Sequence, residues 1–300
     1  MDPFSAEGEL VNIHTAFIQG QYQSVLSDYD ASSFSDSNKL PIQILQYRSQ
    51  CALGQHDQVI KAISDSDAKS TPDLAAVKAY ASFLKNPSAE SKVVSEAETL
   101  AESAGDNLTV ELLCGTILAR AGKQDIALQL LSKHQGSLDA VALIIQIHLS
   151  QNRTDLALKE AKSARSFAQD ALLVNLAESW IGMRQGGENY QKAFYVFEEL
   201  AQAPSSASAT SLIQQAVSEL HMGRVEEAET ALNQALALEP ENAQAVANKL
   251  VLDTIMGKDA SELATKLGKA DKEHEMLTEL AAKREAFQTA MAKYSPKFEP

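Results

Sequence analysis

A short pattern recurs along the 300-residue chain at a nearly fixed interval, and it constrains the fold more than any other feature. The pattern is a Gly, four mostly polar residues and then a small or β-branched apolar residue, and it begins at Gly20, Gly54 and Gly122. The first interval is 34 residues and the second is 68, twice the first. The intermediate copy falls at Ser88, which lacks the Gly but keeps Val93 in phase. Looser copies follow at Asn152, Glu188, Gly223 and Gly257.

A 34-residue period of paired helices is typical of tetratricopeptide repeats. Gly, or Asn at position 152, can adopt the positive φ that ends the first helix of a pair, helix A. The small residue five positions later lets the second helix, helix B, approach its neighbours closely. The unit at 209–242 follows the pattern best, since Pro240 ends its helix B. The repeat therefore predicts an all-α, tetratricopeptide-like solenoid of about eight helix pairs.

Apolar residues recur at helical spacing between these anchors, and strand-like alternation is absent. We expect helices A and B of successive units at 6–19 and 21–31, 40–53 and 55–65, 73–85 and 88–104, 107–121 and 123–134, 137–151 and 153–168, 170–185 and 188–202, 207–222 and 224–238, and 242–256 and 258–268. A last helix at 271–294 has no repeat anchor and is expected to cap the open end of the stack. The prediction is one continuous domain, with the solenoid at 1–270 and the capping helix and tail at 271–300.

Charge and composition exclude several classes of function. The formal net charge is −14 and no run of Lys and Arg is present, so binding to nucleic acid or directly to anionic lipid is not expected. The N-terminus lacks the apolar stretch of a signal peptide, and no apolar run is long enough to span a membrane. Cys51 and Cys114 lie in apolar helical stretches and are expected to be small buried residues in a reducing, cytosolic compartment.

No residue pattern points to catalysis. The six His residues include no pair at the i, i+4 spacing of a helical metal site, and phosphate-binding and nucleophile motifs are absent. We therefore expect no enzymatic activity and no catalytic, cofactor-binding or metal-binding residue. A hydrolase or transferase built on the repeats is the third hypothesis, and a bound metal or cofactor would favour it.

The concave side of such a solenoid is lined by helix A, and this is where a protein partner is expected to bind. Counting from the anchors, the residues on this face are small, apolar or mildly basic. An alternative for each is packing against the next helix, because a solenoid face is shared between core and groove. The expected partner-binding residues are Arg48, Lys78, Ser82, Leu112, Thr116, Ala119, Ala142, Gln146, Leu149, Ile213, Val217 and Leu220.

One segment is less generic than the repeat itself. Residues 176–199 contain Trp180, then Gly186-Gly187-Glu188, then an aromatic-rich helix ending in Glu198-Glu199, and in this order they resemble the coatomer ε-subunit family. The resemblance covers essentially the whole chain. It is also carried by Tyr47-Arg48 with Ala52-Leu53-Gly54, by Gly223-Arg224 through Pro240, by Lys249-Leu250-Val251, by 281–287 and by Tyr294-Ser295-Pro296.

The resemblance implies a non-catalytic, cytosolic coat subunit, peripheral on Golgi membranes and coated vesicles, in Golgi-to-endoplasmic-reticulum retrograde and intra-Golgi transport. It implies repeats curved into a bracelet around a β-hairpin from the C-terminal domain of the coatomer α subunit, with the rest of coatomer bound indirectly. The spacing of the anchors after Gly122 drifts to 30, 36, 35 and then 34 residues, which also favours tight curvature over a uniform groove. The alternative is a tetratricopeptide adaptor or co-chaperone that binds short peptide tails, although the apolar groove lacks the basic residues that clamp a carboxylate.

Overall fold

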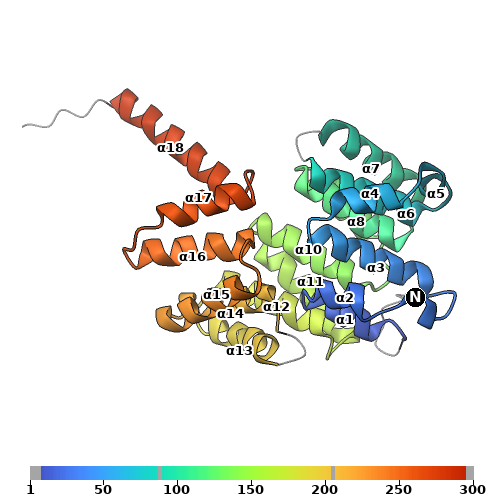
Figure 1. Cartoon of the computed structure of the whole chain (residues 1–300), viewed down its shortest axis with the longest axis horizontal. Helices are drawn as coiled ribbons and strands as arrows, with labels where there is room; N and C mark the ends of the chain where they lie inside the picture. The colour runs from blue at the N-terminus through green and yellow to red at the C-terminus, as the bar shows by residue number, and fades with distance from the viewer. Residues whose placement is uncertain (1–7, 87–89, 204–206, 295–300) are drawn as a thin grey trace, which may run out of the picture. The chain divides into compact units, whose positions relative to one another are not determined.

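The structure is a computed structural model, and it describes residues 8–86, 90–203 and 207–294. These residues form helices joined by short turns, and no strand occurs among them. The chain divides into two compact units, Met1–Ser206 and Ala207–Pro300, here called the first and second units. Figure 1 follows the helices from blue at the N-terminus to red at the C-terminus. None of the helices in the described ranges is long and apolar enough to cross a membrane.

The first unit holds six A/B helix pairs among its described residues, with two short additional elements. The helices are α1 (Val11–Ile18), α2 (Tyr22–Ser27), η1 (Ala31–Ser33), α3 (Lys39–Ala52), α4 (His56–Ala62), α5 (Asp65–Ser70), α6 (Pro72–Lys85), α7 (Glu90–Ala104), α8 (Leu108–Arg120), α9 (Gln124–Leu131), α10 (Leu138–Ser150), α11 (Thr154–Phe167), α12 (Leu172–Gln185) and α13 (Asn189–Gln202).

The second unit holds two further pairs and a long last helix. Its helices are α14 (Ala209–His221), α15 (Val225–Leu238), α16 (Ala243–Ile255), α17 (Ser261–Ala270) and α18 (Glu275–Tyr294). The eight pairs of the described residues confirm the predicted all-α solenoid of paired helices. A partly buried ion-pair network joins α15 to α16, because Lys249 contacts both Glu229, at 2.9 Å, and Asp253, while Lys258 contacts Glu229 at 2.7 Å.

The sequence pattern missed two short elements and misplaced two helix starts. Element η1 lies at the junction between the helices predicted at 21–31 and 40–53, where Asp30 accepts a hydrogen bond from the Ser32 backbone N–H. Helix α5 follows Ser64, whose hydroxyl caps it. Both are short, polar-capped elements without apolar periodicity, which the repeat pattern cannot detect. Helix α1 begins at Val11 rather than 6, and α18 begins at Glu275 rather than 271.

Several sequence-based expectations concern residues outside the described ranges. These are the start of the chain at 1–7, the missing anchor at Ser88, residues 204–206 between the helices predicted at 188–202 and 207–222, and the tail at 295–300.

The turns between paired helices have the predicted backbone conformation. Gly122 has φ 77° and Asn152 has φ 58°, and the anchors Gly20, Gly54, Gly223 and Gly257 also have positive φ. After α8, the N–H of Lys123 donates to the Leu118 carbonyl and that of Gly122 to the Ala119 carbonyl. This hydrogen-bond pair is the Schellman ending of a helix, which requires a left-handed residue at the turn.

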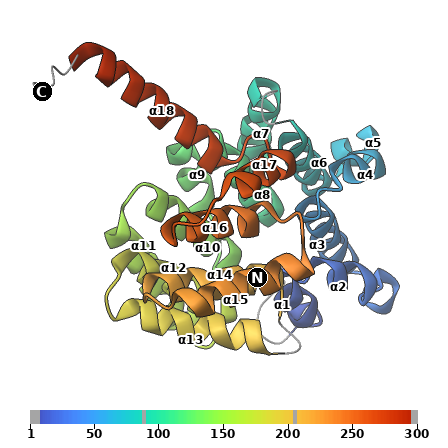
Figure 2. The same cartoon turned by 60° about the vertical axis from the view of Figure 1, so that its left-hand side comes forward.

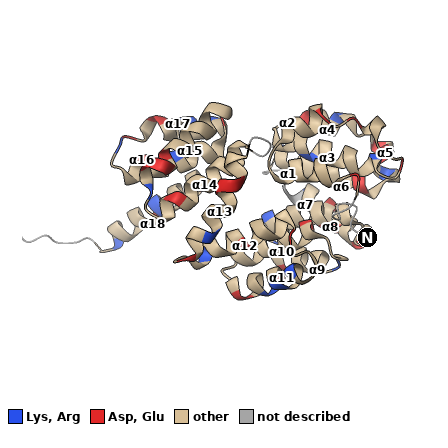
Figure 3. Ribbon diagram, turned by 90° about the horizontal axis from the view of Figure 1, so that it is seen from below, with Lys and Arg blue, Asp and Glu red and all other residues tan. Residues whose placement is uncertain are grey.

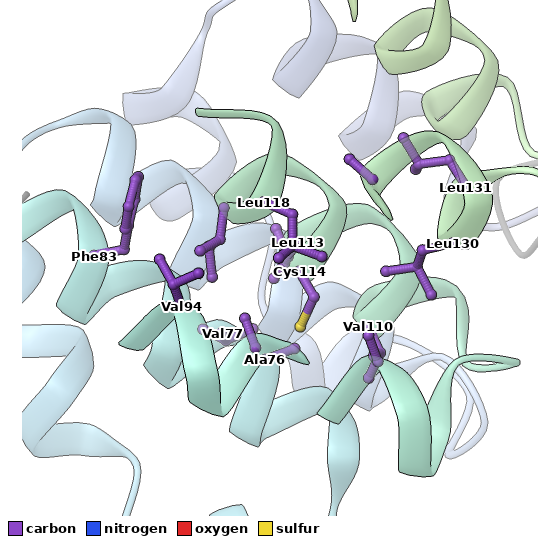
Figure 4. Packing of buried hydrophobic residues seen from close by; sticks show 14 of the residues in the cluster. Ala76, Val77, Phe83, Val94, Val110, Leu113, Cys114, Leu118, Leu130 and Leu131 are labelled. Atoms are coloured by element: carbon purple, nitrogen blue, oxygen red, sulfur yellow. The ribbon is translucent and has the colours of Figure 1, made fainter. Parts of the chain in front are cut away.

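The small residue five positions after the anchor is buried, as predicted, in six of the eight copies of the pattern, whereas Val93 is half-buried and Glu262 is exposed. Val25, Val59, Ala127, Ala157, Ala193 and Ala228 are at most 1% exposed. The close approach of helices is also visible at Gly115 of α8, where an added Cβ would lie 3.1 Å from the Leu131 side chain of α9. Figure 4 shows the core that results, with Phe83, Val94 and Leu118 gathered between α6, α7 and α8.

Helix α18 differs from the paired helices because most of it is exposed. Met276 and Leu277, in its first turn, pack against the small core around Leu267 of α17. Beyond that turn, Phe287 is 64% and Met291 54% exposed, and the helix extends away from α17 (Figure 2). The capping role expected of 271–294 therefore stays a prediction, as does the single-domain division at residue 270.

The positive-φ turn after α8 gives a first testable prediction. Replacing Gly122 with Ala should lower the free energy of unfolding by about 1 kcal/mol, because an L-residue is strained at φ 77°. Nothing lies within 4 Å of the added Cβ, so the loss reports backbone strain alone. Urea unfolding followed by circular dichroism measures it. Asn152→Gly is the comparison at the equivalent turn: it removes strain but also the hydrogen bond that Arg184 donates to the Asn152 side chain, so it should destabilise less than Gly122→Ala. Equal destabilisation by both changes would contradict this account of the turns.

Candidate partner-binding surface

Asp139, in the first turn of α10, joins three helices of the first unit. Nε2 of His14 on α1 donates to its Oδ2 at 2.7 Å, and Nη2 of Arg48 on α3 donates to its Oδ1 at 3.3 Å. The Arg48 guanidinium also lies over the Phe17 ring, 4.4 Å from its centre. The side chains of His14 and Asp139 are 9% exposed and that of Arg48 is 13% exposed. This buried cluster therefore connects the first, second and fifth helix pairs.

The charge of Asp139 is fixed by these two partners. Burial alone raises the pKa of a carboxyl group, but the attraction and hydrogen bonds of His14 and Arg48 outweigh burial and hold the pKa of Asp139 well below its usual range. The carboxylate is consequently ionised at neutral pH. Removing one member of such a buried cluster leaves an uncompensated charge, which costs several kcal/mol.

A cleft of about 280 Å³ opens beside this cluster in the first unit. It lies where the N-terminal ends of α6, α8 and α10 meet one side of α3. Its walls are mostly apolar, with carboxylates at several points. The lining residues are Leu40, Pro41, Ile44, Arg48, Asp73, Asp106, Asn107, Leu108, Thr109, Glu111, Leu112, Leu113, Gln135, Ser137 and Asp139.

Glu111 is the unusual member of the cleft. It is only 3% exposed, yet its carboxylate has no hydrogen bond or ion pair with the residues that the structure describes. Burial raises its pKa to about 7, and the negative charge of Asp106 adds to this shift while Lys133 opposes it. A buried acid without a partner destabilises the folded chain once it ionises.

The structure brings two of the predicted partner-binding residues into this cleft, Arg48 and Leu112. The Arg48 charge is paired with Asp139, and Leu112 is 9% exposed. Two others, Lys78 and Ser82, lie on α6 and make hydrogen bonds within the chain. Lys78 donates to the Ile63 carbonyl and to Asp65, and the Ser82 hydroxyl donates to the Lys78 carbonyl.

The remaining predicted residues of the first unit range from exposed to buried. The Thr116 hydroxyl donates to the Leu112 carbonyl, and Ala119 packs against the core. On α10, Ala142 is 6% and Leu149 8% exposed, while Gln146 is exposed. Gln146 is therefore the α10 position of the predicted set that a partner can reach most directly.

The three predicted residues of the second unit lie together on α14. Ile213 and Leu220 are half-buried against the cluster of Ala216, Ala228 and Leu232, and Val217 is half-buried. Their role in partner binding stays a prediction.

Sequence reasoning missed the acidic residues of the cleft. One signal for Glu111 was available, because it is the single charge inside the apolar run of α8 and shares a face with Gly115 and Leu118. Asp139 gave no such signal, since an Asp in the first turn of a helix is ordinary. Elsewhere Lys and Arg are scattered among Asp and Glu along the helices (Figure 3).

The chain matches known proteins over nearly its full length. The family model of the coatomer epsilon subunit matches residues 6–295. Coatomer subunit epsilon-1 of Arabidopsis thaliana is 30% identical over 98% of this chain and 100% of its own length. The probable coatomer subunit epsilon of Schizosaccharomyces pombe is 31% identical over 87% of this chain and 85% of its own. This chain belongs to the coatomer epsilon subunit family.

Membership of the coatomer epsilon family confirms the resemblance that residues 176–199 indicated. The family is a structural component of a vesicle coat and not an enzyme, as the sequence led us to expect. A coatomer component of this kind associates with other coatomer subunits and has a cytoplasmic, coat-associated location.

A solved structure of a different protein supports the fold assignment. The crystal structure of APC/C hetero-tetramer Cut9-Hcn1 aligns with a TM-score of 0.60 at 16% identity, over 90% of this chain and 54% of that chain. This likeness concerns the fold alone. Together with the paired helices it confirms the tetratricopeptide-like α-solenoid.

The buried cluster gives a second prediction. Asp139→Asn should lower the free energy of unfolding at pH 7 by about 3 kcal/mol, because it leaves Arg48 without a counter-charge. The pKa of Asp139 is lowered in the folded chain, so its contribution is present at neutral pH and declines as pH falls below about 4. Urea unfolding at pH 7 and pH 3 should show the deficit shrinking. Asp155→Asn, at an exposed ion pair, is the control and should change little.

Glu111 gives a third prediction, of opposite sign. Its pKa is raised from 4.5 to about 7, so the free energy of unfolding falls as pH rises between these values. Glu111→Gln should therefore stabilise the free chain by about 2 kcal/mol at pH 8 and by little at pH 4.5. Chemical unfolding at the two pH values tests this. Glu102→Gln, at an exposed position of α7, removes the same charge and should have no such pH-dependent effect.

Proposed function

We propose that this chain binds and stabilises the C-terminal domain of the coatomer α subunit, as a structural coat component in Golgi-to-endoplasmic-reticulum retrograde and intra-Golgi transport. The observation that carries the proposal is the family match over residues 6–295, which makes the chain a coatomer component. The bound element is a hairpin of the α subunit on the helix-A face, and the chain reaches the membrane and the rest of coatomer through that partner.

The curvature of the first unit supports a partner held inside the solenoid. Ile18 of α1 packs against a cluster formed by α12 and α13 that includes Leu176 and Phe197, although more than 150 residues separate Ile18 from these two residues along the chain. The Asp139 cluster adds a second connection from α1 to α10. A unit that curls this strongly offers its helix-A side as an enclosed surface, which suits a folded hairpin.

The charge of the cleft argues against the peptide-tail alternative. A co-chaperone-type repeat binds the terminal carboxylate of its ligand with basic residues. Here the one Arg of the cleft is neutralised by Asp139, and the side chains left without a partner, Asp106 and Glu111, are acidic. A terminal carboxylate would be repelled at this place.

Co-expression with the C-terminal domain of the α subunit tests the proposal. We expect a stoichiometric complex on size-exclusion chromatography, and recovery of the chain without that domain would end the proposal. Gln146→Arg, on the helix-A face, should weaken binding about tenfold or more because it places a large charged side chain at the interface. Gln129→Arg is the matched control, since Gln129 is exposed on helix B α9. Equal effects of the two changes would remove the helix-A face from the interface.

A further inference from the structure

Two carboxylates of the cleft in the first unit are left without partners. Of its four acidic residues, Asp139 is paired with His14 and Arg48. Asp73 accepts hydrogen bonds from Asn107, at 2.8 Å, and from Thr109, at 2.6 Å. The other two, Asp106 and Glu111, have no hydrogen-bonded or ion-paired side-chain partner among the described residues.

Glu111 lines this cleft and is almost fully buried. Only 3% of the residue is exposed. The negative charge of Asp106 further opposes its ionisation, and the positive charge of Lys133 offsets this effect only in part. Apolar side chains would fill the same space in α8 more stably, because an isolated buried charge is costly. The arrangement is accounted for if a cation from outside the chain completes it.

The shape and the walls of the cleft indicate which kind of cation it would bind. Its volume, about 280 Å³, is below the range usual for a whole drug-sized ligand and suits a single long side chain. Leu40, Ile44, Leu108 and Leu112 supply apolar walls on the way to Glu111. Lys and Arg place an aliphatic stem along such walls and a charged head at the far end. Asp106, exposed near the opening, would attract the same charge on entry.

A metal ion fits this donor set less well. Only two carboxylates remain available, and the described residues contain no group of three or more His, Cys, Asp or Glu side chains placed to hold a metal. An anionic ligand is disfavoured by both free carboxylates. The partner chemistry that complements the site is therefore a basic side chain next to aliphatic ones.

We propose that this cleft is a socket for one Lys or Arg side chain of the bound protein partner, with Glu111 as its buried counter-charge and Asp106 at the entrance. The proposal rests on the proposed function in one respect, namely that the side chain belongs to the segment of the α subunit held on the helix-A face. Glu111 then acts as a specificity determinant, because a partner with a neutral residue there leaves the carboxylate uncompensated.

Small cations test the socket without any partner protein. Butylguanidinium and butylammonium reproduce the ends of Arg and Lys, and butyramide is a neutral analogue of similar size. Titrated into the full-length chain and followed by amide NMR, the two cations should give saturable shifts at Leu108, Glu111 and Leu112, and butyramide should not. In Glu111→Gln the affinity for the cations should fall at least fivefold. Equal shifts with butyramide, or an unchanged affinity in Glu111→Gln, would overturn the proposal.

The partner itself provides the second test. Glu111→Gln should weaken binding of the C-terminal domain of the α subunit at least tenfold, although the variant is expected to be the more stable free chain. Glu102→Gln, with the same loss of charge on α7, should bind like the unchanged protein. If the unchanged chain binds the domain and Glu111→Gln binds it equally well, the socket is wrong and the proposed function stands. If the unchanged chain fails to bind the domain, the proposed function is wrong, and the cation titration alone decides the socket.

Discussion

Asp139 holds together parts of the first unit that a repeat architecture does not otherwise connect. In a solenoid each repeat normally contacts only its neighbours. Here one carboxylate on α10 binds His14 of α1, 125 residues away, and Arg48 of α3, 91 residues away. Because charged groups are buried in this cluster, it is stable only when all of them are in place. The curvature of the first unit therefore depends on a specific set of charges as well as on the packing of successive helices.

The cleft is a consequence of the same arrangement. Bringing α3 and α10 together at Asp139 places the N-terminal ends of α6 and α8 around a common space, and Glu111 lies within it. Asp139 also neutralises Arg48, so the space keeps a net negative character. A buried acid is thereby left for something else to balance. Stability and binding oppose each other at this residue, which is common where a site is built for a partner.

The two units differ in the kind of group that they leave without a partner inside the chain. The first unit has an acidic cleft with apolar walls, and the second has α18, whose exposed Leu280, Phe287 and Met291 lie at helical spacing. Exposed apolar stripes of this kind are normally buried when a subunit joins its assembly. Both features are those of a chain that is completed by other proteins, as expected of a structural member of a coat.

The sequence by itself determined the helix pairs, the positive-φ turns at Gly122 and Asn152, and the buried positions such as Ala127 and Ala157. These depend on apolar periodicity and backbone conformation within about 34 residues, which are local properties. Only the tertiary structure decided that His14 and Arg48 meet Asp139 and that Glu111 has no partner. The contact between the first and the fifth helix pair depends on the rotation from each pair to the next, added over four steps. No single repeat specifies this total rotation.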